Sequence, residues 1–190
     1  MMSSSSTRAL ALAPHPAGVR DSAVRAIEAH VRRDPSGLLA LRYTVRGELA
    51  RLVIPPARSP RRAEDLWRHT CFEAFIAPGA GAAYLELNFS PSGEWAGYEF
   101  QAYRKPQAPD REPRGPSTPA QAPSVRTMRA GQELTLEAAA VLECVRGDAP
   151  VRVALAAVLE DSSGALSYWA LRHPSPRPDF HHPDNFALQI

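Results

Sequence analysis

Two neighbouring segments in the middle of the chain alternate between apolar and polar side chains with a period of two residues. In residues 83–90 every second side chain is apolar, and those between them are Tyr84, Glu86, Asn88 and Ser90. Residues 66–76 alternate in a similar way, although Arg68 interrupts the apolar side. Successive side chains of a β-strand point to opposite faces of its sheet. Both segments are therefore predicted to be strands with one apolar face.

Residues 77–81, a short loop of Ala, Pro and Gly, join these two segments. A loop of this kind between alternating segments predicts an antiparallel hairpin. If the two apolar faces share a core, the opposite face gathers polar and aromatic side chains, namely Trp67, His69, Glu73, Tyr84, Glu86 and Asn88. Such a face suits a polar ligand that offers a flat apolar side to an aromatic ring.

Further short segments with strand character recur along the chain between turn residues: 8–12, 38–45, 48–54, 124–129, 133–142, 151–160, 166–171 and 186–190. Residues 23–33 fit either a helix, because of their Ala, Glu and Arg content, or a strand, because apolar residues alternate in them. The turn at residues 34–37 favours a hairpin with the strand that follows. About nine or ten short strands predict an all-β antiparallel sandwich.

A stretch with many prolines interrupts this pattern. Residues 106–123 contain six prolines, and proline removes backbone donors and fixes φ, so we expect no sheet there. Residues 104–123 are predicted to form a long surface loop, because strand patterns resume beyond them. The predicted organisation is a disordered N-terminus at residues 1–7, where small polar residues predominate, followed by a single domain over residues 8–190.

Composition narrows the classes of partner. The net charge is +2, from 22 basic and 20 acidic residues, so no strong field attracts nucleic acid or anionic lipid. The first residues do not resemble a signal peptide, and no stretch reaches the roughly 18 apolar residues of a membrane span. Cys71 and Cys144 could form one bridge or remain buried thiols. We expect a cytoplasmic protein that binds neither nucleic acid nor membrane.

Known catalytic motifs are missing from the sequence. It contains no G-x-S-x-G, G-x-G-x-x-G or P-loop pattern. His173, His181 and His182 lie close together in the chain, but prolines separate them without a fixed metal-ligand spacing. We therefore predict no cofactor and no metal. An enzyme that uses His69 and Glu73 as acid and base stays open as an alternative, as does a protein-interaction domain.

The residues of the predicted meander, together with the C-terminal part, resemble a known family. Leu66-Trp67, Glu73-Ala74-Phe75-Ile76, Tyr84–Asn88 and Ser90–Gly93 are similar to the signature of bacterial DOMON-like domains, and so are residues 167–174 and 178–186. That family is related to carbohydrate-binding module family 9. The resemblance implies a β-sandwich that holds a small polar ligand, plausibly a saccharide, on a concave face. Haem binding, known among other DOMON domains through Met and His ligands, stays open as an alternative, with Met128 as the internal methionine.

The resemblance also implies which residues bind the ligand. Trp67 and Trp169 correspond to two tryptophans that clamp a sugar ring, while Glu73 and Asn88 correspond to groups that bond its hydroxyls. Glu86 stands where the sugar-binding family has an arginine. With His69 from the polar face, the predicted ligand-binding residues are Trp67, His69, Glu73, Asn88 and Trp169. Either tryptophan could instead be a core residue whose indole N–H bonds the backbone, and the position of Trp95 after a turn favours packing.

Overall fold

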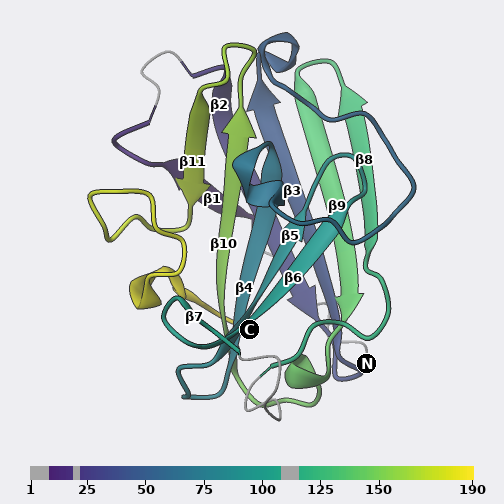
Figure 1. Cartoon of the computed structure of the whole chain (residues 1–190), viewed down its shortest axis with the longest axis vertical. Helices are drawn as coiled ribbons and strands as arrows, with labels where there is room; N and C mark the ends of the chain where they lie inside the picture. Colours follow the sequence, from purple (N-terminus) through teal and green to yellow (C-terminus); the bar gives the residue numbers. More distant parts are fainter. Residues whose placement is uncertain (1–8, 19–21, 108–115) are drawn as a thin grey trace.

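The strands form two facing antiparallel sheets that are joined through one shared strand (Figure 1). This computed structural model describes residues 9–18, 22–107 and 116–190. The first sheet has the order β8-β9-β3-β2-β1. Its strands are β1 (Leu10–Pro14), β2 (Val24–Arg33), β3 (Leu38–Gly47), β8 (Ser124–Ala130) and β9 (Glu133–Val141).

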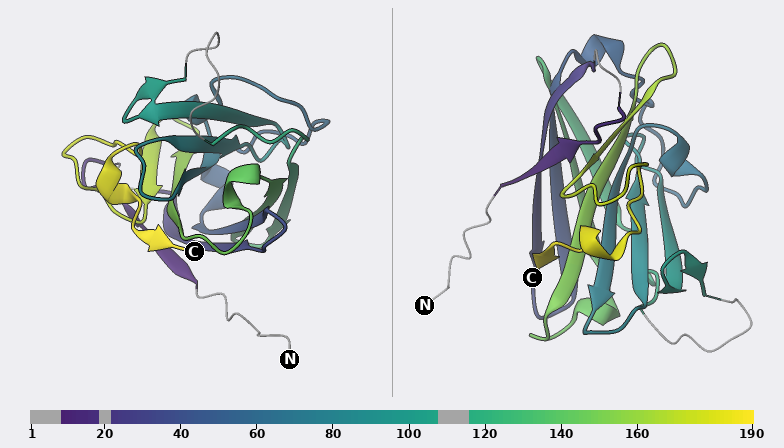
Figure 2. Two further views of the ribbon diagram at one scale, coloured as in Figure 1. Left: turned by 90° about the horizontal axis from the view of Figure 1, so that it is seen from below. Right: turned by 90° about the vertical axis from the view of Figure 1, so that its left-hand side faces the viewer.

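The second sheet continues from β1 in the order β11-β10-β4-β5-β6-β7, with β12 paired to β10. Its strands are β4 (Cys71–Pro78), β5 (Tyr84–Phe89), β6 (Trp95–Ala102), β7 (Lys105–Pro106), β10 (Val151–Glu160), β11 (Leu166–Ala170) and β12 (Leu188–Gln189). The described residues also form short 3-10 helices, η1 (Leu49–Arg51), η2 (Leu66–Arg68), η3 (Glu143–Val145) and η4 (Pro183–Asn185). Seen along the strands, the sheets make two layers (Figure 2, left).

The hydrophobic core fills the space between the two layers. It takes the inward side chains of both sheets, among them Phe72, Leu87 and Leu136, which are fully buried. Tyr43 of β3 packs its ring against Phe72 and donates a 2.7 Å hydrogen bond to the backbone carbonyl of Glu73 across the core. Because the side chains on either side of Glu73 point into this core, its own side chain lies on the outer face of the second sheet.

Two of the turns use the same local arrangement. The Asp34 carboxylate accepts hydrogen bonds from the backbone N–H of Ser36 and Leu38, and Gly37 has a φ of 92°. Asp161 does the same for Ser163 and Ala165, and Gly164 has a φ of 83°. An Asp side chain that bonds the backbone two residues on, followed by a left-handed Gly, fixes a tight turn between antiparallel strands. Each turn closes a hairpin.

The all-β antiparallel sandwich predicted from the sequence is confirmed. The open choice for residues 23–33 is also settled: they form β2, which pairs antiparallel with β3 over most of its length. The hairpin of β4 and β5 pairs Phe72 with Phe89 and Ile76 with Leu85, as the alternation predicts. The short strand predicted at residues 8–12 corresponds to β1, which runs from Leu10 to Pro14 and pairs on both sides, so it is not at a sheet edge.

One predicted strand is wrong, and another begins later than predicted. Residues 48–54 instead form η1 and a single bridge from Leu52 to Asp161. Residues 66–70 are not strand either: Asp65 takes a left-handed φ of 60°, η2 follows, and β4 starts only at Cys71. Alternation over a few residues does not distinguish a strand from a short turn of 3-10 helix.

Part of the proline-rich stretch packs against the second sheet. The loop predicted at residues 104–123 differs at its start, where Lys105–Pro106 form β7 and pair with β6. Residues 116–123 have no helix or strand, yet Pro116, Pro119 and Pro123 are buried. The backbone N–H of Thr118 donates a 2.7 Å bond to the carboxylate of Glu99 on β6. The described part of this segment is thus an ordered cover for the edge of the sheet. Residues 108–115 and the predicted disordered N-terminus up to residue 7 lie outside the described residues.

Both cysteines are free thiols in the structure. Cys71 is buried on β4 and Cys144 is partly buried in η3, so the alternative of one bridge is not realised. Among the described residues, no helix combines the length and the apolar character that crossing a membrane requires.

Candidate functional site

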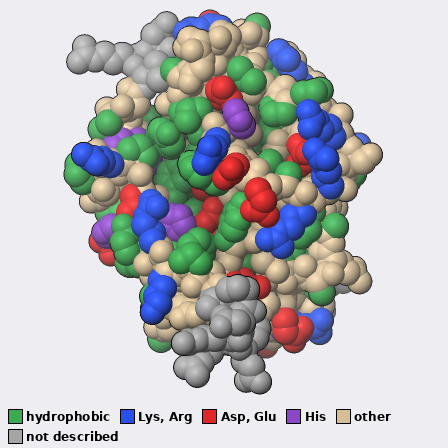
Figure 3. Space-filling view, in the orientation of Figure 1, with side chains coloured by type: hydrophobic (Ala, Val, Ile, Leu, Met, Phe, Trp, Pro, Cys, Tyr) green, Lys and Arg blue, Asp and Glu red, His purple; other side chains and the backbone are tan. Residues whose placement is uncertain are grey.

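The outer face of the second sheet carries a cavity of about 540 Å³. Figure 3 shows this face as a hollow where hydrophobic side chains surround acidic and histidine side chains. The lining residues come from η2, from β4, β5, β6, β10 and β11, and from segments after β6 and β11. They are Trp67, Glu73, Glu86, Tyr98, Phe100, Arg104, Val158, Tyr168, Pro178, Phe180 and His181.

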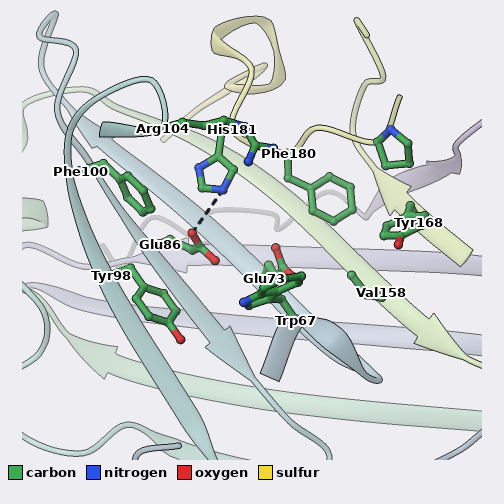
Figure 4. A pocket seen from close by; sticks show the side chains of 11 residues that line it. Trp67, Glu73, Glu86, Tyr98, Phe100, Arg104, Val158, Tyr168, Phe180 and His181 are labelled. Carbon is green, nitrogen blue, oxygen red and sulfur yellow. Dashed lines mark ion pairs between the residues drawn. The ribbon is translucent and has the colours of Figure 1, made fainter. Parts of the chain in front are cut away.

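Two carboxyl groups form the polar floor of this cavity. Glu73 lies on β4 and Glu86 on β5, and both are placed on the outer face by the alternation of their strands. Glu73 is 3% exposed and Glu86 is 5% exposed. Figure 4 shows both between Tyr98 and Phe100 on one side and Phe180 and Tyr168 on the other. A ligand in the cavity would therefore meet two desolvated carboxyl groups.

Burial changes the acidity of this pair. Desolvation, and then the charge of Glu86, raise the pKa of Glu73 well above its usual 4.5. Desolvation also raises the pKa of Glu86 to about 7, although a hydrogen bond from Asn88 and the charge of Arg104 act in the opposite direction. Because each carboxylate disfavours ionisation of the other, the two groups titrate as a pair. Near neutral pH the floor can hold or release a proton.

Glu86 has one hydrogen-bond partner, Asn88, and one close neighbour, His181. Asn88, two residues on along the same face, donates a 2.8 Å hydrogen bond to Glu86 Oε1. His181 Nε2 lies 3.6 Å from Glu86 Oε2, longer than a hydrogen bond. Burial, and next the charge of Arg104, lower the pKa of His181 to about 4. The imidazole is thus neutral near neutral pH and brings no positive charge to Glu86.

Asp179 holds the C-terminal wall of the cavity against the β6–β7 turn. Its carboxylate accepts a 2.6 Å hydrogen bond from Tyr103 Oη and a 2.8 Å bond from the Arg104 guanidinium. It also accepts from the backbone N–H of His181, while Asn185 donates to its backbone carbonyl. This network fixes the segment that carries Phe180 and His181 over the sheet.

Aromatic rings make up most of the cavity walls. Trp67 stands at the mouth on η2 and is 46% exposed. The Arg68 guanidinium lies 5.1 Å from the centroid of its ring. Tyr98 and Phe100 extend from the outer face of β6, and burial, followed by a hydrogen bond with Glu64, raises the pKa of Tyr98. Rings around a polar floor suit a ligand that is flat and apolar on its sides and polar at one end.

The structure brings together part of the set predicted from the sequence. Trp67 and Glu73 line the cavity, and Asn88 supports Glu86 from beside the floor, fully buried. His69 does not line the cavity. Its ring bonds Glu160 at 2.7 Å and its side chain is 65% exposed.

Trp169 lies away from the cavity, inside the core between the two sheets. It is 3% exposed, and its indole N–H donates to Ser167 Oγ at 3.1 Å. Its neighbour Tyr168 points outward and lines the cavity instead. The side chain facing the cavity from β11 is thus one residue before the predicted one. Trp95 is packed in the core, as its position after a turn suggested.

The three histidines near the C-terminus are in different environments. His173 packs edge-on against His15 and bonds the carbonyl of Ala13. His181 lines the cavity, and His182 accepts from the backbone N–H of Asp184 at the start of η4. Within the described residues no three His, Cys, Asp or Glu side chains gather as a metal site would require.

Sequence reasoning missed several lining residues. Arg104, Phe180 and His181 enter the cavity from irregular segments far from β4 and β5 in sequence. Periodicity predicts which face of a strand a residue occupies, but it does not predict where a loop returns to that face. Tyr98 and Phe100 were missed as well, because aromatic residues occupy both faces of residues 95–100 and alternation does not tell the two faces apart.

Comparison with known proteins supports the fold. No protein-family model matches this chain, and no curated protein matches it in sequence. A proposed carbohydrate-binding protein from Bacteroides uniformis is similar in structure, with a TM-score of 0.61 and 14% identity over 94% of this chain and 84% of that one. A carbohydrate-binding module of family 9 from Caldicellulosiruptor kristjanssonii, solved in complex with cellotriose, has a TM-score of 0.52 and 11% identity over 87% of this chain and 72% of that one. The chain therefore shares its fold with carbohydrate-binding proteins.

Proposed function

We propose that this protein is a non-catalytic binding domain for a saccharide, and a DOMON-like relative of the family 9 modules. The observation that carries the proposal is the cavity itself: aromatic walls enclose a floor of buried carboxyl groups on the outer face of the sheet. Sugar rings offer apolar C–H faces to aromatic side chains and hydroxyls to polar groups. A volume of about 540 Å³ is within the usual range for small-ligand sites.

The fold likeness adds a second line of support. One protein of this fold was solved with cellotriose, a linear glucose trisaccharide. In our proposal Trp67 stacks on one face of a ring at the mouth, while Glu73 and Glu86 bond hydroxyls at the floor. Tyr168 and Phe180 take the place on the opposite wall that the resemblance assigned to Trp169.

Direct titration tests this function. Cellobiose and cellotriose are titrated by calorimetry into the wild-type protein and into Trp67→Ala. We expect the wild type to bind with an affinity in the micromolar to millimolar range, and Trp67→Ala to lose at least about tenfold, because about 1.4 kcal/mol of stacking and area burial is removed.

Met128→Ala is the matched control, because Met128 is 40% exposed on β8 of the other sheet. It should bind as the wild type does. If a panel of neutral and charged saccharides produces no heat and no change in melting temperature, the saccharide proposal fails.

A further inference from the structure

We propose that the ligand of this cavity carries a protonated amine, which Glu73 and Glu86 receive, so that the preferred saccharide is an amino sugar. This inference rests on the proposed saccharide function and adds the charge of the ligand to it. Three features of the cavity lead to it: a carboxyl group without a partner, the absence among the described residues of a Lys or Arg bonded to either carboxyl group, and the aromatic walls.

The carboxyl group of Glu73 is buried without a bond. Its side chain is 3% exposed and faces the cavity (Figure 4). Among the residues that the structure describes, no donor bonds either of its oxygens, and desolvation and the charge of Glu86 are what act on it. A buried ionisable group normally has a partner, because desolvation costs several kcal/mol without one. A donor from the ligand would complete this site.

The charges around the floor do not offset the two carboxyl groups. Arg104 is the cation nearest to them in the lining, and its guanidinium already bonds Asp179 at 2.8 Å. His181 faces Glu86 and is neutral near neutral pH. A third acidic residue, Glu64, bonds Tyr98 beside the cavity, but it is paired with Arg62 at 3.4 Å, so it neither adds to nor offsets the charge of the floor. Desolvation keeps the two carboxyl groups partly protonated near neutral pH when the cavity is empty. An ammonium group would stabilise their ionised form, so that its binding releases a proton, whereas a neutral ligand would leave their protonation unchanged.

The walls favour a cation as well. Trp67, Tyr98, Phe100, Tyr168 and Phe180 all line the cavity. The face of an aromatic ring attracts a positive charge, and this attraction is stronger where water is excluded. Aromatic rings around an acidic floor form a setting that recognises ammonium groups. Neutral hydroxyls gain nothing from the ring faces beyond their C–H contacts.

Three disaccharides with the same ring and linkage test the charge of the ligand. Cellobiose carries a hydroxyl at carbon 2, the β-1,4-linked glucosamine disaccharide an ammonium group, and diacetylchitobiose a neutral acetamide. Titration calorimetry near neutral pH, where Glu86 is partly ionised, compares their affinities. We expect the glucosamine disaccharide to bind at least about tenfold more tightly than cellobiose, because charge-assisted hydrogen bonds are roughly twice as strong as neutral ones.

Two variants assign the preference to the floor. Glu73→Gln keeps the size of the side chain and removes its charge, so the preference for the amine should fall to near one while cellobiose binding changes less. Glu137→Gln removes the same charge from β9 on the other sheet, where Glu137 pairs with Arg42. It should keep the full preference, which separates the floor from a general effect of net charge.

The outcomes distinguish the two proposals. Equal or tighter binding of cellobiose overturns the amine inference and leaves the saccharide function in place. Binding of butylammonium ion, together with no binding of any disaccharide, overturns the saccharide function and supports a site for amines. An amine preference that persists in Glu73→Gln and in Glu73→Gln/Glu86→Gln overturns the role of the floor.

Discussion

The two predicted clamp residues, Trp67 and Trp169, differ in how deeply they are buried. Trp67 is 46% exposed at the mouth of the cavity, and Trp169 is 3% exposed in the core. Trp169→Ala should cost roughly 3–5 kcal/mol of unfolding free energy, the usual cost of emptying a core aromatic site. Trp67→Ala should cost about 1 kcal/mol or less, because nearly half of the Trp67 surface is exposed and the residue lies outside the core.

Urea denaturation of both variants measures this difference. Trp169→Phe serves as the control, since it retains most of the apolar volume and loses only the bond to Ser167. If Trp67→Ala proves as destabilising as Trp169→Ala, then Trp67 is a packing residue, and its assignment to the ligand site is wrong.

The buried carboxyl pair predicts a dependence of stability on pH. Burial raises the pKa of Glu86 from 4.5 to about 7, so between these values the folded state binds more protons than the unfolded chain. Stability from this group is therefore full below about pH 4.5 and is lost as the pH rises through about 7, by on the order of 1–3 kcal/mol. Glu73, whose pKa is also raised, acts with the same sign.

His181 acts with the opposite sign. Burial lowers its pKa from 6.5 to about 4, so the unfolded chain binds more protons in that window and stability falls as the pH drops through it. In Glu73→Gln/Glu86→Gln the loss of stability between pH 5 and 8 should disappear, whereas Glu137→Gln should keep it. Melting temperatures across this range provide the measurement. An unchanged pH profile in the double variant would show that the pair is not the source.

At the scale of elements, one carboxylate attaches the C-terminal segment to the sheet. Asp179 accepts from Tyr103, from Arg104 and from the backbone of His181. Asp179→Ala should release the segment that carries Phe180, and with it one cavity wall. We expect ligand affinity to fall by at least about tenfold while the two sheets stay folded, because the segment lies outside the core between them.

Hydrogen exchange can locate this effect. The amides of residues 179–186 should exchange faster in Asp179→Ala, while those of β4 and β10 keep their protection. Arg177→Ala, in the same segment but outside the cavity lining, is the matched control. Faster exchange throughout β4 would mean that Asp179 stabilises the sandwich as a whole and does not act on the wall alone.

The elements that the sequence predicted well are those with a local cause. The β2–β3 hairpin follows from alternation and from the turn at Asp34 and Gly37. The β4–β5 hairpin follows from alternation and from the loop that contains Pro78 and Gly79. Residues 66–70 were missed because the left-handed φ at Asp65 and a bond from Thr70 Oγ1 to the carbonyl of Val53 decide their path. Such long-range contacts leave no periodic pattern in the sequence.

At the scale of the molecule, the floor of the site was predictable and its walls were not. Glu73 and Glu86 lie on strands whose outward face follows from alternation alone. Phe180 and Arg104 reach the same cavity through a network centred on Asp179. The sequence also did not predict that Tyr168, and not Trp169, faces the cavity. The register in which β11 pairs with β10 decides which of these two side chains points into the core.

The role of β1 leads to a prediction for the whole molecule. Leu10 to Leu12 pair with β2, and Ala13 and Pro14 pair with β11, so this strand closes the gap between the two sheets. Deleting residues 1–14 would leave β2 and β11 as open edges, and open edges pair with other chains. We expect a lower melting temperature and concentration-dependent association, observed by size-exclusion chromatography.

Deleting residues 1–8 alone keeps both pairings and should leave the protein unchanged. If the shorter deletion associates equally strongly, unpaired edges are not the cause. If the longer deletion stays monomeric with the wild-type melting temperature, then β1 does not hold the sheets together, and their shared core alone does so.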